Sequence, residues 1–301
     1  MSPARPRISV FPKCYFDPLC RGEMDYVTWI RSAATLGAEG LEHYDGFFRS
    51  VRGTDVDPAI LAMAETGQVS SMLCFSPDFT HPDAAERARQ ITRQQVAIDL
   101  AVRLGTTFCR TLSGQRRPGL TRSEGIARTV DALCRSVEYA ERRDVMLCLE
   151  NHYKDGTWQY AEFAQPEDVF LEILERVDSP RLGVQYDPSN ALIAGYDPIR
   201  FLERVMPRVV TMHASDRHMV AGTTIEQLRE SDGTIGYSDK LRHGEVGQGL
   251  IDYDAIFRIL ERARFSGWIS VEDGLNGLDE LRRSVAFLQE KRSQYYTNTQ
   301  S

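Results

Sequence analysis

The sequence lacks several features that mark other classes of protein. Its 301 residues contain no CxxC pair, no Lys/Arg run and no apolar stretch of membrane-spanning length. The first residues, MSPARPRISVFPK, do not include the apolar core of a signal peptide. With a formal net charge of −7, the chain also lacks the basic footprint of a nucleic-acid-binding protein. These absences predict a cytoplasmic protein with no membrane or nucleic-acid partner.

Cysteine is scarce and unpaired, and the composition is otherwise that of a globular protein. Hydrophobic residues make up 42% of the chain and charged residues 26%, so disorder is not expected. In a chain this long, six scattered cysteines indicate reduced core residues rather than a disulfide framework. They are Cys14, Cys20, Cys74, Cys109, Cys134 and Cys148.

Short apolar runs alternate with longer amphipathic segments along the whole chain. We expect strands at 7–16, 38–45, 69–76, 107–113, 145–152, 182–189, 209–216 and 268–274. Between them, helices are expected at 24–37, 84–105, 123–143, 253–264 and 278–292. Helix-boundary residues fit this assignment. Gly37 and Gly105 follow helices, and Asp57, Asp197 and Asp252 stand at N-cap positions.

Eight strands, each followed by a helix, predict a (β/α)8 TIM barrel spanning residues 1–301 as a single domain. The competing doubly wound sheet needs a glycine-rich turn after its first strand, and KCYFDPLCRGEMD does not provide one. The longest connection is the loop 218–251 after the seventh strand, and residues 293–301 form a C-terminal tail. The barrel is the favoured architecture.

Polar side chains stand at the ends of the last four predicted strands, where a barrel collects its functional residues. Glu150, Asp187, His213 and Glu272 each close an otherwise apolar run. Three carboxylates and one imidazole suit Mn²⁺, with Mg²⁺ or Co²⁺ as alternatives, better than a structural zinc site. Each residue alone is equally compatible with a helix N-cap, a loop ion pair or a packing histidine. The four together predict one divalent metal.

His152 stands two residues beyond Glu150 in the segment LENHYKDG. Because side chains alternate along a strand, both are expected to point into the barrel mouth. An imidazole beside a bound substrate can exchange protons near neutral pH, so His152 is the candidate general base. The alternative is that it only hydrogen-bonds the substrate or orients Glu150.

At these residues the sequence resembles the xylose isomerase-like, or sugar phosphate isomerase/epimerase, superfamily of metal-dependent barrels. The resemblance is carried by GLEHYDG, LCLENH, GVQYDPSN, VVTMHASD, HGEVGQGLIDYDAIFRIL and WISVEDG. It implies that Glu150, Asp187, His213 and Glu272 bind one divalent cation. Many members have Asp-x-x-His after the sixth strand, whereas this chain has Asn190, which argues against the multi-zinc DNA-repair nucleases of the same fold.

Within the superfamily, LENHYKDGTWQYAEFAQP is most similar to the catalytic subunit of C-glycoside deglycosidases. That resemblance implies a carbon–carbon lyase that acts on 3-keto C-glycosides with a smaller β-rich partner subunit, in a hetero-oligomer. Proton abstraction at C2 by His152 would be followed by loss of the aglycone. The alternatives are a ketose 3-epimerase or isomerase that uses Glu150 and Glu272 on opposite faces of an enediolate, and a non-catalytic scaffold subunit.

Five further residues are candidates for substrate binding. Glu42 and His43 end the second strand, His81 follows the third, Asn190 follows the sixth, and Arg217 follows the seventh. A buried Glu–His pair that satisfies itself is the alternative for the first two. The aromatic loop 153–166 fits an aglycone or sugar face, a lid packed on the barrel, or a partner contact.

Overall fold

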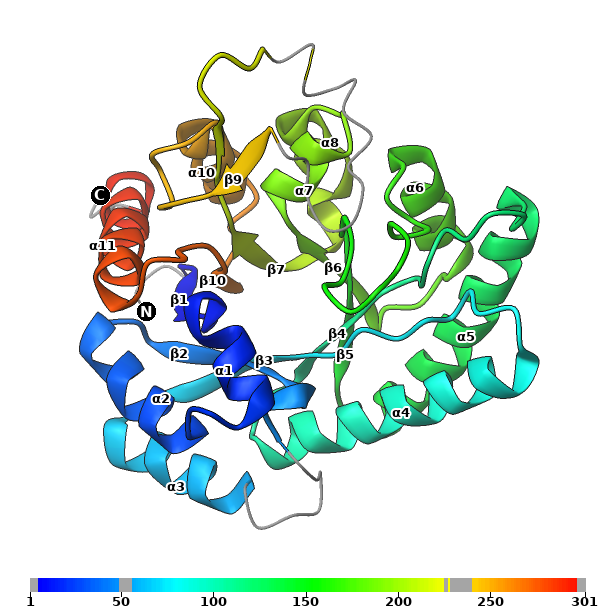
Figure 1. Ribbon diagram of the computed structural model, residues 1–301, viewed down its shortest axis with the longest axis horizontal. Coiled ribbons are helices and arrows are strands. Elements are labelled where there is room, and N and C mark those ends of the chain that lie inside the picture. The colour runs from blue at the N-terminus through cyan, green and yellow to red at the C-terminus, as the bar shows by residue number, and fades with distance from the viewer. Residues whose placement is uncertain (1–4, 49–55, 225–226, 228–239, 297–301) are drawn as a thin grey trace.

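The barrel is present as predicted in the computed structural model, which describes residues 5–48, 56–224, 227 and 240–296. Eight parallel strands close in the order β1-β10-β7-β6-β5-β4-β3-β2, and the helices surround them (Figure 1). The barrel strands are β1 (Arg7–Val10), β2 (Gly40–Tyr44), β3 (Val69–Cys74), β4 (Phe108–Thr111), β5 (Met146–Glu150), β6 (Leu182–Tyr186), β7 (Val209–Ala214) and β10 (Trp268–Val271).

Helices connect the successive strands of the barrel. They are α1 (Phe16–Arg21), α2 (Tyr26–Ala33), α3 (Val56–Thr66), α4 (Ala84–Arg103), α5 (Arg122–Arg142), α6 (Glu167–Arg176), α7 (Pro188–Ile193), α8 (Pro198–Val205), α10 (Tyr253–Arg262) and α11 (Leu278–Tyr295). Two short strands, β8 (Arg217–Met219) and β9 (Leu241–His243), pair as an antiparallel ribbon after β7. The predicted loop 218–251 therefore contains ordered strand structure, while 225–226 and 228–239 lie outside the described residues.

All eight predicted barrel strands exist, but each is shorter than its sequence pattern. The largest error is at the first, which was expected to run from 7 to 16 and ends at Val10. Pro12 precedes a 3-10 helix over Lys13–Tyr15, and α1 follows directly and ends at Gly22, whose φ of 69° is left-handed. The apolar residues of FPKCYF thus cover the barrel mouth instead of extending the strand.

Helix boundaries follow the capping residues in most places. Asp197 and Asp252 accept hydrogen bonds from the backbone of α8 and α10, and Gly37 and Gly105 have φ of 77° and 82°. The expected cap at Asp57 is wrong, because Asp57 lies inside α3. The predicted tail also begins too early, since α11 continues to Tyr295; residues 297–301 lie outside the described part of the chain.

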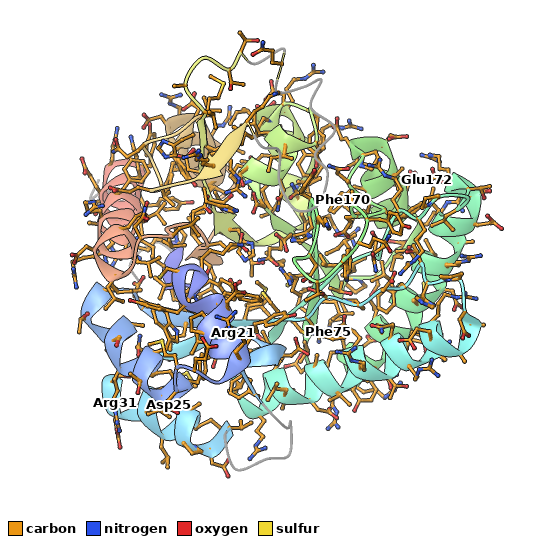
Figure 2. All side chains as sticks on the ribbon, viewed as in Figure 1. Arg21, Asp25, Arg31, Phe75, Phe170 and Glu172 are labelled. Carbon is orange, nitrogen blue, oxygen red and sulfur yellow. The ribbon has the colours of Figure 1, made fainter. Side chains whose placement is uncertain are left out.

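Alternation along the strands divides their side chains between two apolar regions. Leu147 and Leu149 of β5 belong to the main core, which lies between the strands and the helices, whereas Cys148 packs with Met72 and Cys74 in a separate cluster. Figure 2 shows side chains filling the space between strands and helices, and there Phe170 of α6 meets the ring of Phe201 at 5.4 Å. Glu150 is two residues beyond Cys148, so its side chain points to the same face of β5 as Cys148, toward the inside of the barrel.

The cysteines are all free, as expected, but they are not all core residues. Cys74, Cys109 and Cys148 are buried, Cys14 is partly buried, and Cys20 and Cys134 are exposed. Among the described helices, none is long and apolar enough to cross a membrane.

His43 of β2 faces outward from the barrel and is completely buried. Its Nε2 lies 2.9 Å from Ser70 Oγ, which in turn donates to the Leu104 carbonyl, so the hydroxyl accepts from the imidazole. The Tyr26 hydroxyl lies 2.5 Å from Nδ1 and donates to it. Both nitrogens of the neutral ring are thereby satisfied. Burial lowers the pKa of His43 to about 3, because the interior penalises the charged form.

This histidine predicts a loss of stability in acid. Above pH 6.5 His43 is neutral in both states, but at lower pH only the unfolded chain takes up the proton until the pH nears 3. We expect the stability advantage of the wild type over His43→Gln, measured by urea unfolding, to shrink by up to about 1.4 kcal/mol per pH unit below 6.5. An advantage that is the same at pH 7 and pH 4.5 would contradict this assignment.

Candidate metal centre and active site

The barrel brings the four predicted ligands together at one point. Glu150 is the last residue of β5, Asp187 follows β6 as the N-cap of α7, His213 lies in β7, and Glu272 follows β10. One donor atom from each lies within 4.8 Å of the other three. All four residues are buried, and Glu272, at 8%, is the most exposed.

The imidazole of His213 lies at the centre of this cluster. Its Nδ1 is 3.1 Å from Glu150 Oε1, 3.8 Å from Asp187 Oδ2 and 3.4 Å from Glu272 Oε2. Its Nε2 is 2.6 Å from Glu42 Oε1. Because a carboxylate only accepts, the Nε2 hydrogen is directed at Glu42. Burial lowers the pKa of His213, but the charges of Glu42, Glu272 and Glu150 outweigh it and raise the pKa well above its ordinary value, so Nδ1 also carries a proton when no cation is bound.

Each carboxylate has one oxygen held by its protein partners and the other turned toward His213, and in Glu150 this second oxygen also accepts from the Asn190 amide at 3.3 Å. Glu150 Oε2 accepts from Arg110 at 2.9 Å, and Glu272 Oε1 accepts from Lys13 Nζ at 3.1 Å. Asp187 Oδ1 accepts from Ser189 Oγ, Ser215 Oγ and the Asn190 backbone at 2.7–3.0 Å. The oxygens left over are those that converge on one point.

Asp187 has one carboxylate oxygen that its protein neighbours leave available to a cation. Its Oδ2 is buried without a hydrogen-bond partner among the described residues. Burial, together with the charges of Glu272 and Glu150, raises the pKa of Asp187 to about 6. The Asn151 side chain holds the residue in place, since it donates to the Asp187 carbonyl at 2.7 Å and accepts from its N–H at 2.8 Å.

The other two carboxylates are kept ionised by their neighbours. Burial raises the pKa of Glu150, but His213, His152 and Arg110 outweigh it and lower the pKa to about 2. Burial likewise opposes ionisation of Glu272, and Lys13 and His213 bring its pKa below the usual range. The three carboxylate oxygens and His213 Nδ1 thus form a buried set of four donor atoms, which fits a divalent cation that would replace the proton on Nδ1.

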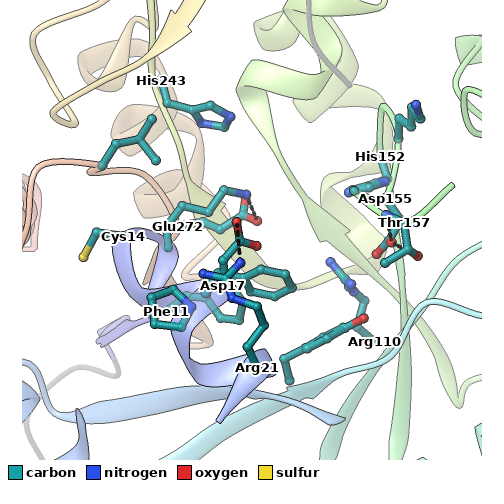
Figure 3. Close-up of a pocket in the computed structure, with 17 residues that line it drawn as sticks. Phe11, Cys14, Asp17, Arg21, Arg110, His152, Asp155, Thr157, His243 and Glu272 are labelled. Carbon is teal, nitrogen blue, oxygen red and sulfur yellow. Dashed lines mark hydrogen bonds and ion pairs between the residues drawn. The ribbon is translucent and has the colours of Figure 1, made fainter. Parts of the chain in front are cut away.

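A cavity of about 620 Å³ opens beside this donor set. Glu272 belongs to its wall, together with His152, Arg110 and Lys13. In Figure 3, His152 and His243 lie on opposite sides of the cavity, and they come from the segment after β5 and from β9. The volume is within the usual range for small-molecule sites.

His152 is in the cavity wall although β5 ends two residues before it. Its Nδ1 lies 3.3 Å from Glu162 Oε2, and Glu162 Oε1 accepts from the backbone and hydroxyl of Ser113. Burial lowers the pKa of His152, but the charges of Glu150 and Glu162 outweigh it, and the pKa is raised. The contact directs Nδ1 toward Glu162 and leaves Nε2 as the nitrogen for proton exchange.

The structure does not place the five weaker candidates in the wall of this cavity. Glu42 instead holds His213, and His43 is on the helix-facing side of β2, because neighbouring residues on a strand point to opposite faces. His81 lines a separate cavity of about 300 Å³. The Asn190 amide donates to Glu150 Oε1 at 3.3 Å, and Arg217 pairs with Asp273 at 2.7 Å.

Asp216, the first acidic residue after β7, has a structural role. Asp216 Oδ2 accepts from the backbone N–H groups of Gly247 and Gly249 at 2.9 and 3.0 Å, and Oδ1 accepts from Ile251. A Cβ on Gly249 would lie 2.2 Å from Asp216 Oδ1. Asp216 therefore fixes the turn HGEVGQG, and that turn carries His243 to the cavity.

The cavity residues that sequence reasoning missed include four basic side chains: Lys13, Arg110, Lys154 and His243. Arg110 left a usable signal, since it is the only charged residue inside the apolar strand TFCRT. Lys13 was hidden by the overlong first strand. No pattern marks Lys154 or His243, because their positions depend on how the segments after β5 and β7 fold back.

The aromatic loop 153–166 packs mainly against the barrel. Tyr153, Trp158 and Phe163 are buried, and a Cβ on Gly125 of α5 would lie 2.2 Å from the Phe163 ring. Glu162 forms an isolated bridge with Gln115. Of the three interpretations of this loop, the packed cover is the one that its described contacts fit.

Removing one ligand charge tests the metal site. We expect Glu272→Gln to weaken Mn²⁺ binding by 10-fold or more, because the neutral amide loses the charge that attracts the cation while its size is kept. Titration calorimetry on chelator-treated protein measures this. Glu280→Gln, a buried glutamate outside the donor set, is the matched control and retains wild-type affinity. Equal affinities for both variants would contradict the assignment.

Comparisons with curated proteins find sugar-converting enzymes and a nuclease. The inosose dehydratase of Bacillus thuringiensis (strain Al Hakam) is 21% identical over 145 residues, which cover 47% of this chain and 45% of that protein. The chain thus spans less than half the length of this relative. The 3-oxo-isoapionate decarboxylase of Pectobacterium atrosepticum is 28% identical over 244 residues, 74% of this chain and 80% of its own length. A probable endonuclease 4 of Methanoculleus marisnigri is 27% identical over 232 residues, which cover 73% of this chain and 79% of that protein.

Among solved structures, the IOLI protein with a bound zinc atom has a TM-score of 0.74. Its sequence is 16% identical, and the match covers 97% of this chain and 99% of that one. A likeness at this identity shows a shared fold.

A family profile gives the broadest result. The profile described as Xylose isomerase-like TIM barrel matches residues 30–291, which include seven of the eight barrel strands and all four members of the donor set. The chain belongs to the Xylose isomerase-like TIM barrel family.

Proposed function

We propose that the protein is a divalent-metal-dependent lyase that acts on a keto-sugar, with a 3-keto C-glycoside as its substrate. The observation that carries this proposal is the pairing of a buried four-donor set with an imidazole in one cavity: Glu272 and His152 both line it. The donor set suits Mn²⁺, Mg²⁺ or Co²⁺. Bound there, a divalent ion would supply Lewis-acid stabilisation of negative charge.

His152 is suited to the role of base. A proton on the carbon next to a ketone is weakly acidic, and in a 3-keto glucoside that carbon is C2. His152 Nε2 would take this proton while Glu162 stabilises the imidazolium through Nδ1. The electron pair then forms the C1–C2 double bond, the bond from C1 to the aglycone breaks, and the aglycone leaves with the pair and is protonated.

The positions of the charged groups support proton abstraction at this place. Arg110 and Lys13 each hold one oxygen of a donor carboxylate, so the donor set is fixed before substrate arrives. Burial of the set keeps water away from the charges and strengthens their action on the substrate.

Two of the three curated relatives named above fit a lyase, and the third is a probable endonuclease 4. A dehydratase and a decarboxylase both remove a group from a carbonyl compound, as the proposed elimination does. Two observations argue against a nuclease. The net charge of −7 does not favour binding to nucleic acid. Asn190, whose amide donates to Glu150, stands where the multi-zinc enzymes of this fold are expected to have another metal-binding histidine.

A 3-epimerase or isomerase is the alternative that the site also supports. Glu150 and Glu272 both contact His213 Nδ1 from different strands, an arrangement compatible with two carboxylates that exchange protons with one substrate. We further propose the smaller β-rich partner subunit that the resemblance implies, which makes the active species a hetero-oligomer.

The decisive assay uses Mn²⁺-loaded protein in D₂O, with and without a candidate partner. The substrates are 3-keto C- and O-glucosides and simple ketoses. We expect the keto-glucosides to release their aglycone, and chromatography measures this release. Recovery of a deuterated epimer or isomer without release would replace the lyase by the alternative. A tightly bound metal with no turnover of any of these sugars would favour the scaffold.

The role of His152 is tested separately from metal binding. We expect His152→Ala to keep wild-type Mn²⁺ affinity and to lose about 10²- to 10⁴-fold in kcat, because only the base is removed. His81→Ala, in the neighbouring cavity, serves as the matched control with unchanged kcat. Full turnover by the His152 variant would exclude this residue as the base.

A further inference from the structure

Most cations in the wall of the 620 Å³ cavity are already neutralised by carboxylates. Lys13 pairs with Glu272 at 3.1 Å, and Arg110 pairs with Glu150 at 2.9 Å. Arg21, at the rim, pairs with Glu23 at 2.7 Å. These groups are committed to the protein and contribute little net charge toward a ligand.

The two imidazoles of the wall are paired in the same way. His152 lies 3.3 Å from Glu162, and His243 contacts Asp273. The pattern in this wall is therefore one acidic partner for each basic group.

Lys154 departs from this pattern. It lines the cavity and is only 3% exposed, and within the described part of the chain its ammonium group makes no ion pair or hydrogen bond. The neighbouring carboxylate of Asp155 is engaged elsewhere, since its Oδ1 accepts from the backbone and hydroxyl of Thr157 at 2.9 and 2.7 Å. Lys154 is thus a buried cation facing the cavity without a counter-charge.

A largely buried ammonium without a partner is costly, because it has lost part of its hydration and gained no compensating contact. A ligand that supplies the missing negative charge would offset this cost. Lys154 follows His152 by two residues, and both line the cavity, so this charge would be bound close to the proposed base.

We propose that Lys154 binds an anionic oxygen group of the substrate. Two sources have this chemistry: the carboxylate of a sugar acid, and the ionised phenol of an aromatic aglycone. In the second case the ammonium also stabilises the negative charge that gathers on the aglycone as its bond to C1 breaks. The inference rests on the proposed function, because it takes this cavity to be the keto-sugar site.

The test measures binding to Mn²⁺-loaded protein by titration calorimetry, without turnover. One pair of probes is D-gluconate and D-glucitol; the other is 4-nitrophenol, at a pH where it is ionised, and 4-nitroanisole. We expect the wild type to bind the anionic member of at least one pair about 10-fold or more tightly than the neutral member, as a charge-assisted hydrogen bond provides. The pair that is discriminated identifies the source of the charge.

Lys154→Met, and Lys154→Gln as a second neutral variant, should lose this preference, and Lys154→Arg should keep it. Lys291→Met is the matched control, since Lys291 of α11 pairs with Asp254 of α10, and neither residue lines the cavity. The ligand-free Lys154→Met protein is also expected to melt at a higher temperature than the wild type, because an unpaired buried charge is removed.

Two results would overturn the proposal: a wild type that discriminates neither pair, or a neutral Lys154 variant that keeps the preference. Because no probe is converted, the outcome does not depend on whether the enzyme is a lyase. Suppose that the neutral Lys154 variants lose the anion preference while the wild type forms an epimer in the D₂O assay. The lyase proposal would then be wrong, and Lys154 would still be the anion-binding residue.

Discussion

The site depends on one constraint: three carboxylates and an imidazole are buried with their donor atoms within 4.8 Å of one another. Like charges at this distance repel, and burial makes each of them harder to ionise. The raised pKa of Asp187 beside the lowered pKa values of Glu150 and Glu272 shows how the protein by itself divides the conflict. A bound dication would relieve the repulsion among all three carboxylates, and other side chains of the barrel hold the candidate ligands in position.

That support comes from elements far apart in the sequence. Lys13 comes from the segment after β1 to fix Glu272, Arg110 of β4 fixes Glu150, and Glu42 of β2 fixes His213. These supports come from β2, β4 and the segment after β1, whereas the ligands come from β5 and β7 and from the ends of β6 and β10. The two groups together take up most of the closed barrel, so the geometry of the donor set depends on barrel closure. The same closure brings the His152–Glu162 contact to the wall that Glu272 shares, so the proposed proton transfer and charge stabilisation would occur in one cavity.

The architecture and the four donors could be predicted because both depend on simple periodicities. Apolar runs of strand length predicted the eight strands. Because the ends of parallel barrel strands meet at one face, Glu150 and Glu272 could be expected to lie close together although they are 122 positions apart in the sequence. The partners of these residues could not be predicted this way. Glu42 and His43 are adjacent and both polar, and only the register of β2 decides that one holds His213 while the other bonds Tyr26 and Ser70. Lys154 and His243 depend on loops that no short-range pattern specifies.

The most direct measurement is a crystal structure of the protein soaked with Mn²⁺, with anomalous scattering recorded to locate the metal. The account predicts one strong peak in contact with the Asp187 Oδ2 atom that is buried without a partner, with Glu150, His213 and Glu272 as the remaining protein ligands. Well-ordered side chains of these four residues with no peak between them, or a peak bound by other residues, would contradict it.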